Sequence, residues 1–295
     1  KNVRVAHDVC LAALPSKDGS LPAQQCGSLP ACLLHASRIE KRQQSGEPPL
    51  LRDTVVCPLH FWGFKHIIEI PPQQVRAGKD AFPQRDKVVA GATVQMVAGL
   101  NAALPSASQH ATELDALARS SGTAAWKSKL YHRDQIRGAL NDPDLDFIYF
   151  YCHARGGRNE PVKLPVLEFR DQPPGSTALT MKSADLGTGT MWSHHPLLFL
   201  NGCGTAGFST DALSPFITAA VQDRGAAGAI GTEIPVWEYL AGDFSLRFAA
   251  SFLKGVPAGE AMLLTRRALL AEYNPLGLIY TLYAVAGLTL TRNGA

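Results

Sequence analysis

The sequence predicts an α/β fold: a mostly parallel β-sheet with helices on both faces. Short apolar runs at 147–152 (FIYFYC) and 197–200 (LLFL) are typical of strands that are buried on both sides. Helical patterns alternate with such runs along the chain, and this alternation is the signature of a parallel sheet. The chain has 295 residues, 46% hydrophobic and 18% charged, which is enough to bury the core of a large sheet.

The sequence predicts an irregular extension over 1–54 and a folded domain over 55–295. Prolines at positions 15, 22, 30, 48 and 49 interrupt regular structure in the extension. The run 61–70 (FWGFKHIIEI) predicts a covering strand or a short helix that ends at the following prolines. The elements expected next are a strand at 88–100, a helix at 106–120 with Ser108 as its cap, and a helix at 134–140.

The C-terminal part continues the same alternation. The polar, glycine-rich stretch 171–195 is expected to be a long surface excursion. Around it, the expected elements in chain order are strands at 147–152, 166–169 and 197–200, a helix at 213–224, a strand at 226–231, and helices at 239–254 and 257–272.

Charge and hydropathy exclude two classes of partner. The formal net charge of +3 is dispersed along the chain, whereas a nucleic-acid-binding surface needs a concentrated basic stripe. No apolar run reaches the roughly 18 residues of a membrane span, and no basic-then-apolar leader opens the chain. We therefore expect a cytoplasmic protein without nucleic-acid or membrane contacts. Because the first residue is Lys1, we also expect a piece of a longer protein.

The six cysteines contain no close pair of the CxxC kind. Free thiols in a reducing compartment are the expected state, without a metal or an organic cofactor. One alternative remains open, a zinc site in the N-terminal part, although zinc sites usually contain at least one tight ligand pair. Its ligands would come from Cys10, Cys26, Cys32, Cys57, His7 and His35.

A candidate nucleophile and a candidate base each follow one of the predicted strands. Cys203 stands in the small-residue turn 201–206 (NGCGTA), and His153 ends the run that begins at Phe147. The carboxyl ends of parallel strands meet at one edge of a sheet, which is where such folds place their working groups. A thiol with a pKa of about 8.5 needs a nearby imidazole to form a thiolate at neutral pH. The pattern predicts Cys203 as nucleophile and His153 as base, with Cys152 turned away into the core.

Three stretches resemble the CHAT domain, a bacterial branch of the caspase and separase superfamily: 148–157 (IYFYCHARGG), 197–206 (LLFLNGCGTA) and 225–270. The similarity covers about residues 55–290, and the 50-residue separation of His153 and Cys203 is also that of caspases. The resemblance implies a caspase-like fold and a cysteine endopeptidase. It also implies that the backbone amides near Gly204 and Gly156 form the oxyanion hole.

The resemblance is less informative about the substrate. In separases an aspartate that accepts a P1 arginine stands where this chain has Pro235, so the simplest argument for a basic substrate is missing. Glu233 lies two residues earlier, on the same face of an extended strand, and could supply a charge instead. Asp185 lies in the excursion between the two catalytic residues. We expect Glu233, Pro235 and Asp185 to contribute to substrate binding.

CHAT domains commonly stand beside a sensor region in multidomain proteins. The resemblance therefore implies a regulated effector of bacterial signalling or defence, with a protein substrate and a sensor or activator domain as partners. Two alternatives stay open. One is a catalytically silent scaffold or regulatory module with the same fold. The other is a dinucleotide-binding domain, because residues 202–207 (GCGTAG) fit G-x-G-x-x-G after a strand, although helical character resumes only near position 213.

Overall fold

The computed structural model describes residues 4–5, 44–46, 55–56, 61–72, 85–155, 166–171, 178–202, 215–232, 234 and 236–292. The chain forms two compact units. The smaller comprises residues 1–67 and 262–278, and the larger comprises residues 68–261 and 279–295. Only five residues of the predicted extension over 1–54 are described, so its division from the folded domain stays a prediction.

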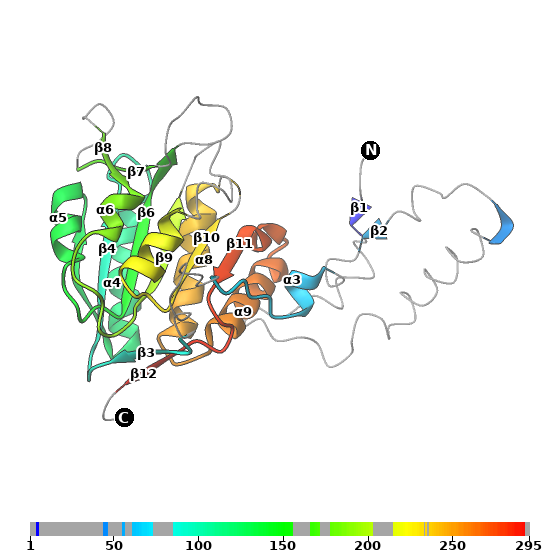
Figure 1. Cartoon of the computed structure of the whole chain (residues 1–295). Helices are drawn as coiled ribbons and strands as arrows, with labels where there is room; N and C mark the ends of the chain where they lie inside the picture. The colour runs from blue at the N-terminus through cyan, green and yellow to red at the C-terminus, as the bar shows by residue number, and fades with distance from the viewer. Residues whose placement is uncertain are drawn as a thin grey trace. The chain divides into compact units, whose positions relative to one another are not determined.

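The larger unit is built on an eight-stranded sheet (Figure 1). Six strands follow one another in the order β11-β10-β9-β6-β4-β5. All neighbours in this row are parallel except β10 and β11, which confirms the predicted mostly parallel sheet. Their bounds are Val94–Leu100 for β4, Ala124–Leu130 for β5, Phe147–Arg155 for β6, Leu197–Gly202 for β9, Gly228–Thr232 for β10 and Tyr280–Tyr283 for β11.

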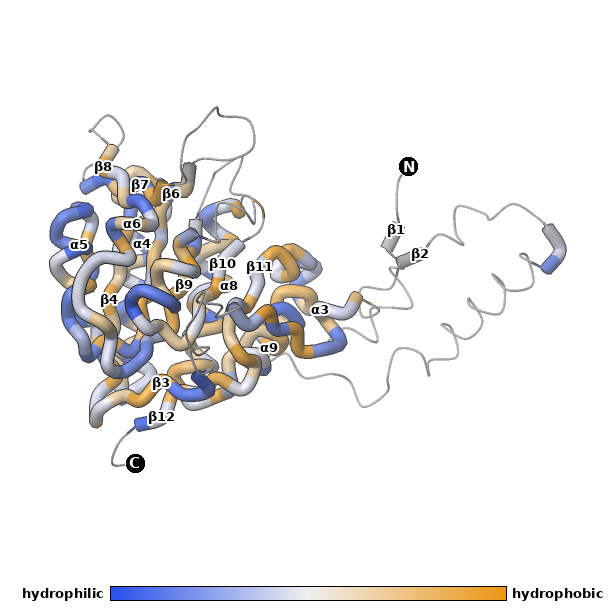
Figure 2. Tube along the Cα trace, in the orientation of Figure 1, coloured by the Kyte–Doolittle hydropathy of each residue, from blue (hydrophilic) through white to orange (hydrophobic). Residues whose placement is uncertain are grey.

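Helices cover both faces of this sheet, as predicted. One face packs on α5 (Arg133–Ala139), α6 (Ser183–Gly187) and the π-helical segment η5 (Ala219–Asp223) through a single apolar cluster. The other face packs on α4 (Ala107–Ser121) and α8 (Glu238–Phe252). Hydrophilic residues gather on α5, at the outside of the unit (Figure 2).

The alternation of side chains along β6 explains this division. Ile148, Phe150 and Cys152 belong to the apolar cluster, together with residues of α5, α6 and η5. Tyr149, between them, forms hydrogen bonds with a histidine of α4 and a serine of α8. Because successive residues of a strand point to opposite faces, one strand contributes to two chemically different layers.

Strand β6 changes its partners near its end. Residues 147–151 pair with β4 and residues 147–152 with β9, both in parallel. The last three residues, from His153 to Arg155, pair antiparallel with β7 (Val166–Phe169), which in turn pairs with β8 (Leu179–Lys182). His153 is thus the first residue of β6 that belongs to the antiparallel ladder.

Two predictions for the first half of the sheet are wrong. The single strand expected over 88–100 is divided by residues 91–93 into β3 (Lys87–Ala90) and β4, and β3 pairs instead with β12 (Thr289–Arg292). Helix α4 is preceded by Ser106 rather than Ser108 at its N-cap position. The Ser106 hydroxyl makes no capping bond, because it is bonded to the hydroxyl of Tyr151 at 2.6 Å.

The prediction of a surface excursion over 171–195 is also wrong for residues 178–195, although Asp171, the other described residue of this range, is exposed. The segment 178–195 forms β8 and α6, and Trp192 is buried. The guanidinium of Arg224 secures the segment by donating to the carbonyls of Leu186, Thr188 and Thr190, and it lies 4.3 Å from the centre of the Trp192 ring. A buried arginine that is bonded to carbonyl oxygens fixes the backbone around it.

The smaller unit contains α3 (Trp62–Lys65), residues 262–271 of α9 (Ala258–Ala271) and residues 275–278 of the 3₁₀ helix η6 (Pro275–Ile279). A short helix, one of the two predictions for 61–70, is confirmed over Trp62–Lys65, but it ends at Lys65 rather than at the prolines. Arg266 of α9 is buried and donates to the carbonyl oxygens of Gly63 and Gly277, and burial lowers its pKa to about 10.

Candidate active site

The ends of β6 and β9 bring the two predicted catalytic positions into neighbouring strands. Tyr151 pairs with Asn201, and Cys152 pairs with Gly202. His153 is the next residue of β6, and Cys203 is bonded to Gly202. Cys203 itself is outside the described residues, as are four other predicted site residues: Gly156, Gly204, Glu233 and Pro235.

His153 is half-buried. By strand alternation it lies on the α4–α8 face of β6, two residues beyond Tyr151 and four beyond Tyr149. Cys152, between the two, is fully buried in the apolar cluster on the opposite face, so the prediction that it turns away from the site is confirmed. Asn201 on β9 has its side chain on the same face as Tyr149 and donates to the Tyr149 hydroxyl at 2.9 Å.

Glu168 of β7 is a residue that sequence reasoning missed. It is the antiparallel partner of His153, and directly opposed side chains share one face of a sheet with Cβ atoms about 4.5–5.5 Å apart. Glu168 is only 2% exposed. The Nε and Nη2 atoms of Arg170 lie 3.1 Å from its Oε1, and Asn101 donates to its backbone carbonyl. Only the β6–β7 register identifies it, because nothing in the run 166–169 (VLEF) marks a site.

A buried polar network lies behind the site on the α4–α8 face. The Asn201 amide donates to the Tyr149 hydroxyl and to the carbonyl of Ala241 at 2.7 Å, and its oxygen accepts from the Tyr280 hydroxyl at 2.9 Å. Tyr149 is also bonded to Nε2 of His110 at 2.8 Å. This network ties β6, β9 and β11 to α4 and α8, which gives the edge beside His153 a rigid support.

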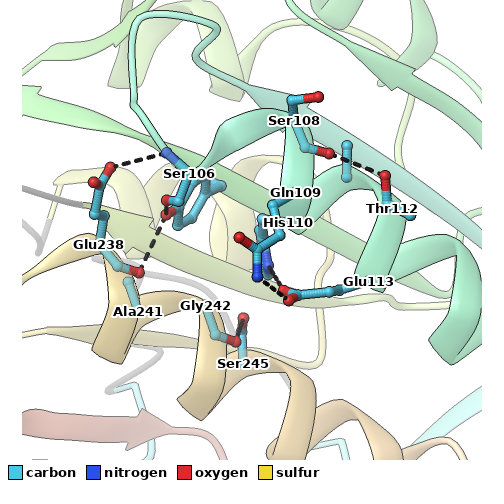
Figure 3. A network of polar contacts seen from close by, with 12 residues as sticks. Ser106, Ser108, Gln109, His110, Thr112, Glu113, Glu238, Ala241, Gly242 and Ser245 are labelled. Atoms are coloured by element: carbon cyan, nitrogen blue, oxygen red, sulfur yellow. Dashed lines mark hydrogen bonds and ion pairs between the residues drawn. The ribbon is translucent and has the colours of Figure 1, made fainter.

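A pocket of about 140 Å³ opens between α4 and α8. In Figure 3 the side chains of Gln109, His110 and Glu113 on α4 point toward the first turns of α8. Tyr151, two residues before His153, lines the same pocket. We call this the α4–α8 pocket; its lining residues are Ser106, Gln109, His110, Glu113, Tyr151, Glu238, Tyr239, Gly242, Asp243 and Leu246.

Asp185 lies in α6, which packs on the opposite face of the sheet from His153. Its carboxylate accepts from the backbone N–H of Lys182 at 2.8 Å, as part of a helix cap, and lies 3.8 Å from Arg137. It lines a second pocket of about 260 Å³ together with Arg224. Asp185 therefore caps α6, and the contribution of Asp185 to substrate binding stays a prediction.

Two further observations concern the described residues only. No group of three or more His, Cys, Asp or Glu side chains among them could hold a metal ion. The six residues proposed for the alternative zinc site all lie outside the described residues, so that alternative stays a prediction. None of the described helices combines the length and apolar character that crossing a bilayer requires.

The described part of the chain thus defines an α/β protein with a candidate active site at the carboxyl edge of a mostly parallel sheet. No family model matches the chain. It is similar to a probable protease of Vitiosangium sp. (strain GDMCC 1.1324), with 28% identity over 253 residues. The alignment covers 80% of this chain and 31% of that protein, so the chain spans about a third of the length of the curated relative.

Among solved structures, the chain is similar to the Saccharomyces cerevisiae separase–securin complex. The sequence identity is 11% and the TM-score is 0.36. The superposition covers 68% of this chain and 12% of the other. A likeness this distant carries no functional argument.

Proposed function

We propose that the chain is a cysteine endopeptidase of the caspase-like, CHAT type, with Cys203 as nucleophile and His153 as base. The observation that carries the proposal is the register of the two parallel strands, in which Cys152 pairs with Gly202. Each catalytic candidate is the residue directly after one member of that pair. A curated relative with the name of a probable protease supports the same class of reaction.

Chain connectivity bounds the distance between the two residues. Consecutive Cα atoms lie 3.8 Å apart, and paired strands lie about 4.8 Å apart. The Cα atoms of His153 and Cys203 are therefore within about 12 Å of each other at most. That bound leaves a Cys and a His side chain within reach of a direct hydrogen bond.

The proposed reaction has two steps. The Cys203 thiolate attacks the carbonyl carbon of the scissile peptide bond, and the amides of Gly204 and Gly156 stabilise the oxyanion. The C–N bond then breaks, and His153 transfers its proton to the leaving amine. A water molecule gives a proton to His153 and attacks the thioester, which releases the acid and regenerates the thiol.

Glu168 is proposed as a positioning residue for His153. Its carboxylate lies on the same face as the imidazole, one strand away, and is held from behind by Arg170. A carboxylate that accepts a hydrogen bond from an imidazole fixes the orientation of the ring. This is the role that an acid commonly takes behind a catalytic histidine.

The wider setting is also a proposal. A chain that spans about a third of its curated relative fits the effector part of a larger protein. We propose a cytoplasmic bacterial signalling or defence protein in which a sensor or activator domain controls cleavage of a protein substrate. Glu233, Pro235 and Asp185 are proposed to contact that substrate.

The test compares new protein N-termini in cell extracts treated with the chain or with its Cys203→Ala variant. Without the nucleophile, cleavage is expected to fall by at least about 10⁴-fold, to background. Cys152→Ala is the matched control, since it removes a buried thiol at the paired position of the neighbouring strand and should retain cleavage. Undiminished cleavage by Cys203→Ala would end the assignment.

Alkylation distinguishes the enzyme from the silent scaffold. An activated thiolate reacts with iodoacetamide much faster than an ordinary thiol. Rapid modification of Cys203 alone supports the peptidase, and slow, uniform modification of the thiols supports a scaffold. Binding of NAD to the chain would instead support the dinucleotide alternative for residues 202–207.

A further inference from the structure

The α4–α8 pocket is acidic. Glu113 of α4 and Glu238 and Asp243 of α8 line it, and among the described residues its lining includes no lysine or arginine. Asp243 is paired with Arg247, whose Nε lies 2.6 Å from Oδ1. In the part of the chain that the structure describes, no lysine or arginine pairs with the carboxylate of Glu113 or Glu238, so the lining has an excess of negative charge that a cation would neutralise.

His110 provides an independent observation. It is 2% exposed, and among the described residues its Nδ1 atom has no hydrogen-bond partner. The nearest charged atom is Oε2 of Glu113, at 3.5 Å, without hydrogen-bond geometry. A buried polar atom without a partner is unfavourable by about 1–3 kcal/mol. Such an atom beside a pocket indicates a missing ligand group.

The network behind His110 shows which kind of group is missing. The Ser245 hydroxyl donates to the carbonyl of Gly242 at 2.9 Å, so its oxygen accepts the proton of the Tyr149 hydroxyl at 3.0 Å. Tyr149 then has no proton for His110 and accepts from its Nε2 at 2.8 Å. The imidazole therefore carries its proton on Nε2, and Nδ1 is a bare acceptor.

Two acceptors thus face each other, Nδ1 of His110 and the carboxylate of Glu113. Burial lowers the pKa of His110, so the neutral ring persists even beside this carboxylate. A ligand with several N–H donors and a positive charge would satisfy both atoms, once the Glu113 side chain turns toward it. A guanidinium group has five such donors in a fixed plane.

The size and the rim of the pocket suit the end of a long side chain. A volume of about 140 Å³ corresponds to a few water molecules, each of which takes up about 30 Å³ of the liquid. Tyr239, which is 74% exposed, lines the pocket and offers an aromatic face to a cation. Gly242 leaves room at the inner end, because a Cβ there would lie 3.3 Å from Nδ1 of His110.

We infer that the α4–α8 pocket binds the guanidinium or ammonium group of an arginine or lysine side chain of the substrate polypeptide. The choice of a substrate side chain rests on the proposed function. Tyr151 connects the two sites: it lines the pocket and precedes His153 by two residues, which is about 7 Å along a strand.

The first test measures binding and needs no peptide cleavage. A negative result would therefore overturn the pocket assignment without bearing on the proposed peptidase activity. Binding of N-acetyl-L-arginine amide to the Cys203→Ala chain is measured by calorimetry. N-acetyl-L-citrulline amide, a neutral molecule of nearly the same shape, is the control probe. We expect the arginine probe to bind at least about tenfold more tightly, because its hydrogen bonds are charge-assisted. Equal affinity for the two probes would overturn the inference.

Variants locate the binding. Glu113→Gln is expected to weaken the arginine probe by about tenfold, and Glu238→Gln is a second variant in case the first fails to fold. Asp115→Asn is the matched control: it removes the same charge from α4, at a carboxylate paired with Lys129 and absent from the pocket lining. Loss of affinity in Asp115→Asn but not in Glu113→Gln would contradict the assignment.

The second test identifies the source of the cation. Sites cleaved by the unmodified chain are expected to carry arginine or lysine at one fixed position, and Glu113→Gln is expected to lose this preference. Cleavage without such a preference would show that the pocket serves free cations instead. That outcome would leave the peptidase intact and overturn the substrate assignment.

Discussion

The two faces of β6 differ in chemistry although they alternate along the same strand. On the α5–α6 face, Ile148, Phe150 and Cys152 join an apolar cluster. On the α4–α8 face, Tyr149 and Tyr151 enter hydrogen bonds with both helices, and His153 follows at the edge. The first face stabilises the sheet mainly by burial, whereas the second uses polar contacts that orient groups beside the candidate site.

The difference shows how one strand can serve stability and chemistry together. Apolar packing is non-directional and tolerates small shifts, so it can carry most of the free energy of folding. Hydrogen bonds are directional, and a satisfied buried network defines one arrangement of its members. Changes on the two faces should therefore have different consequences.

The largest effect on stability is expected on the apolar face. Phe150 is fully buried and packs edge-to-face on Phe169, with ring centres 5.7 Å apart. Phe150→Ala should lower the free energy of unfolding by about 3–5 kcal/mol. Tyr149→Phe keeps the aromatic ring and leaves only the hydrogen-bond partners unsatisfied. This substitution should therefore lower the free energy of unfolding by about 1–3 kcal/mol. Urea denaturation measures both, and a larger loss for Tyr149→Phe would contradict the comparison.

A smaller effect, on reactivity rather than stability, is expected for Glu168. Glu168→Gln keeps the shape of the side chain and removes the carboxylate that is proposed to orient His153. We expect cleavage to slow by about tenfold, which is less than the roughly 10²–10⁴-fold that a general acid–base group itself contributes, because His153 remains in place. The pH dependence of Cys203 alkylation should also change, with slower reaction at neutral pH.

A structural role alone would leave that pH profile unchanged. Glu260→Gln, which makes the same substitution at an exposed position of α9, is the control. Profiles of the two variants that superimpose would remove Glu168 from the mechanism and leave the Cys–His proposal in place. Iodoacetamide rates between pH 5 and 9 provide the measurement.

The smallest effect concerns acid stability on the polar face. Burial lowers the pKa of His110 below its ordinary value of 6.5, although Glu113 opposes the shift. Below pH 6.5 the unfolded chain therefore binds a proton that the folded chain does not, and the free energy of unfolding falls as the pH decreases. The charged groups that face this pocket from α8 are Glu238 and Asp243.

The variant His110→Gln, which can still donate to Tyr149, should lose less stability between pH 7 and pH 5. Thermal unfolding at several pH values measures the difference. His195, whose pKa is also lowered by burial, remains in both proteins and cancels from the comparison. An identical pH dependence in the two proteins would place the acid sensitivity elsewhere.

The sequence predicted the inner strands well, because a strand that is buried on both faces needs a continuous apolar run, such as 197–200. It missed β5, whose residues 124–130 (AAWKSKL) are only partly buried at the edge of the sheet. It also missed β11, which pairs antiparallel with β10 beyond the last predicted helix. The pattern of β5 is weak because the strand is only partly buried, whereas β11 is mostly buried but has only four residues, too few to show a period.

The candidate site was predictable only where the chemistry stands next to a strand end. His153 and Cys203 meet this condition. His110 does not, because it lies within α4, 39 positions from its partner Tyr149. Asn201 lies at the end of β9, but its role depends on a bond to Tyr149, 52 positions away. Glu168 lies opposite His153 only because of the antiparallel register of β6 and β7, which no local sequence pattern predicts. Long-range pairing, rather than residue type, selects these side chains.

The change of partners along β6 has a mechanical consequence. His153 is coupled to β7 and β8, whereas the strand before it is clamped between β4 and β9. His153 is therefore coupled to any displacement of the β7–β8 pair more directly than the residues of β6 that precede it. Leu167 and Phe169 of β7 and Met181 of β8 are buried in the apolar cluster, so a displacement of these two strands would reach the core as well as the imidazole.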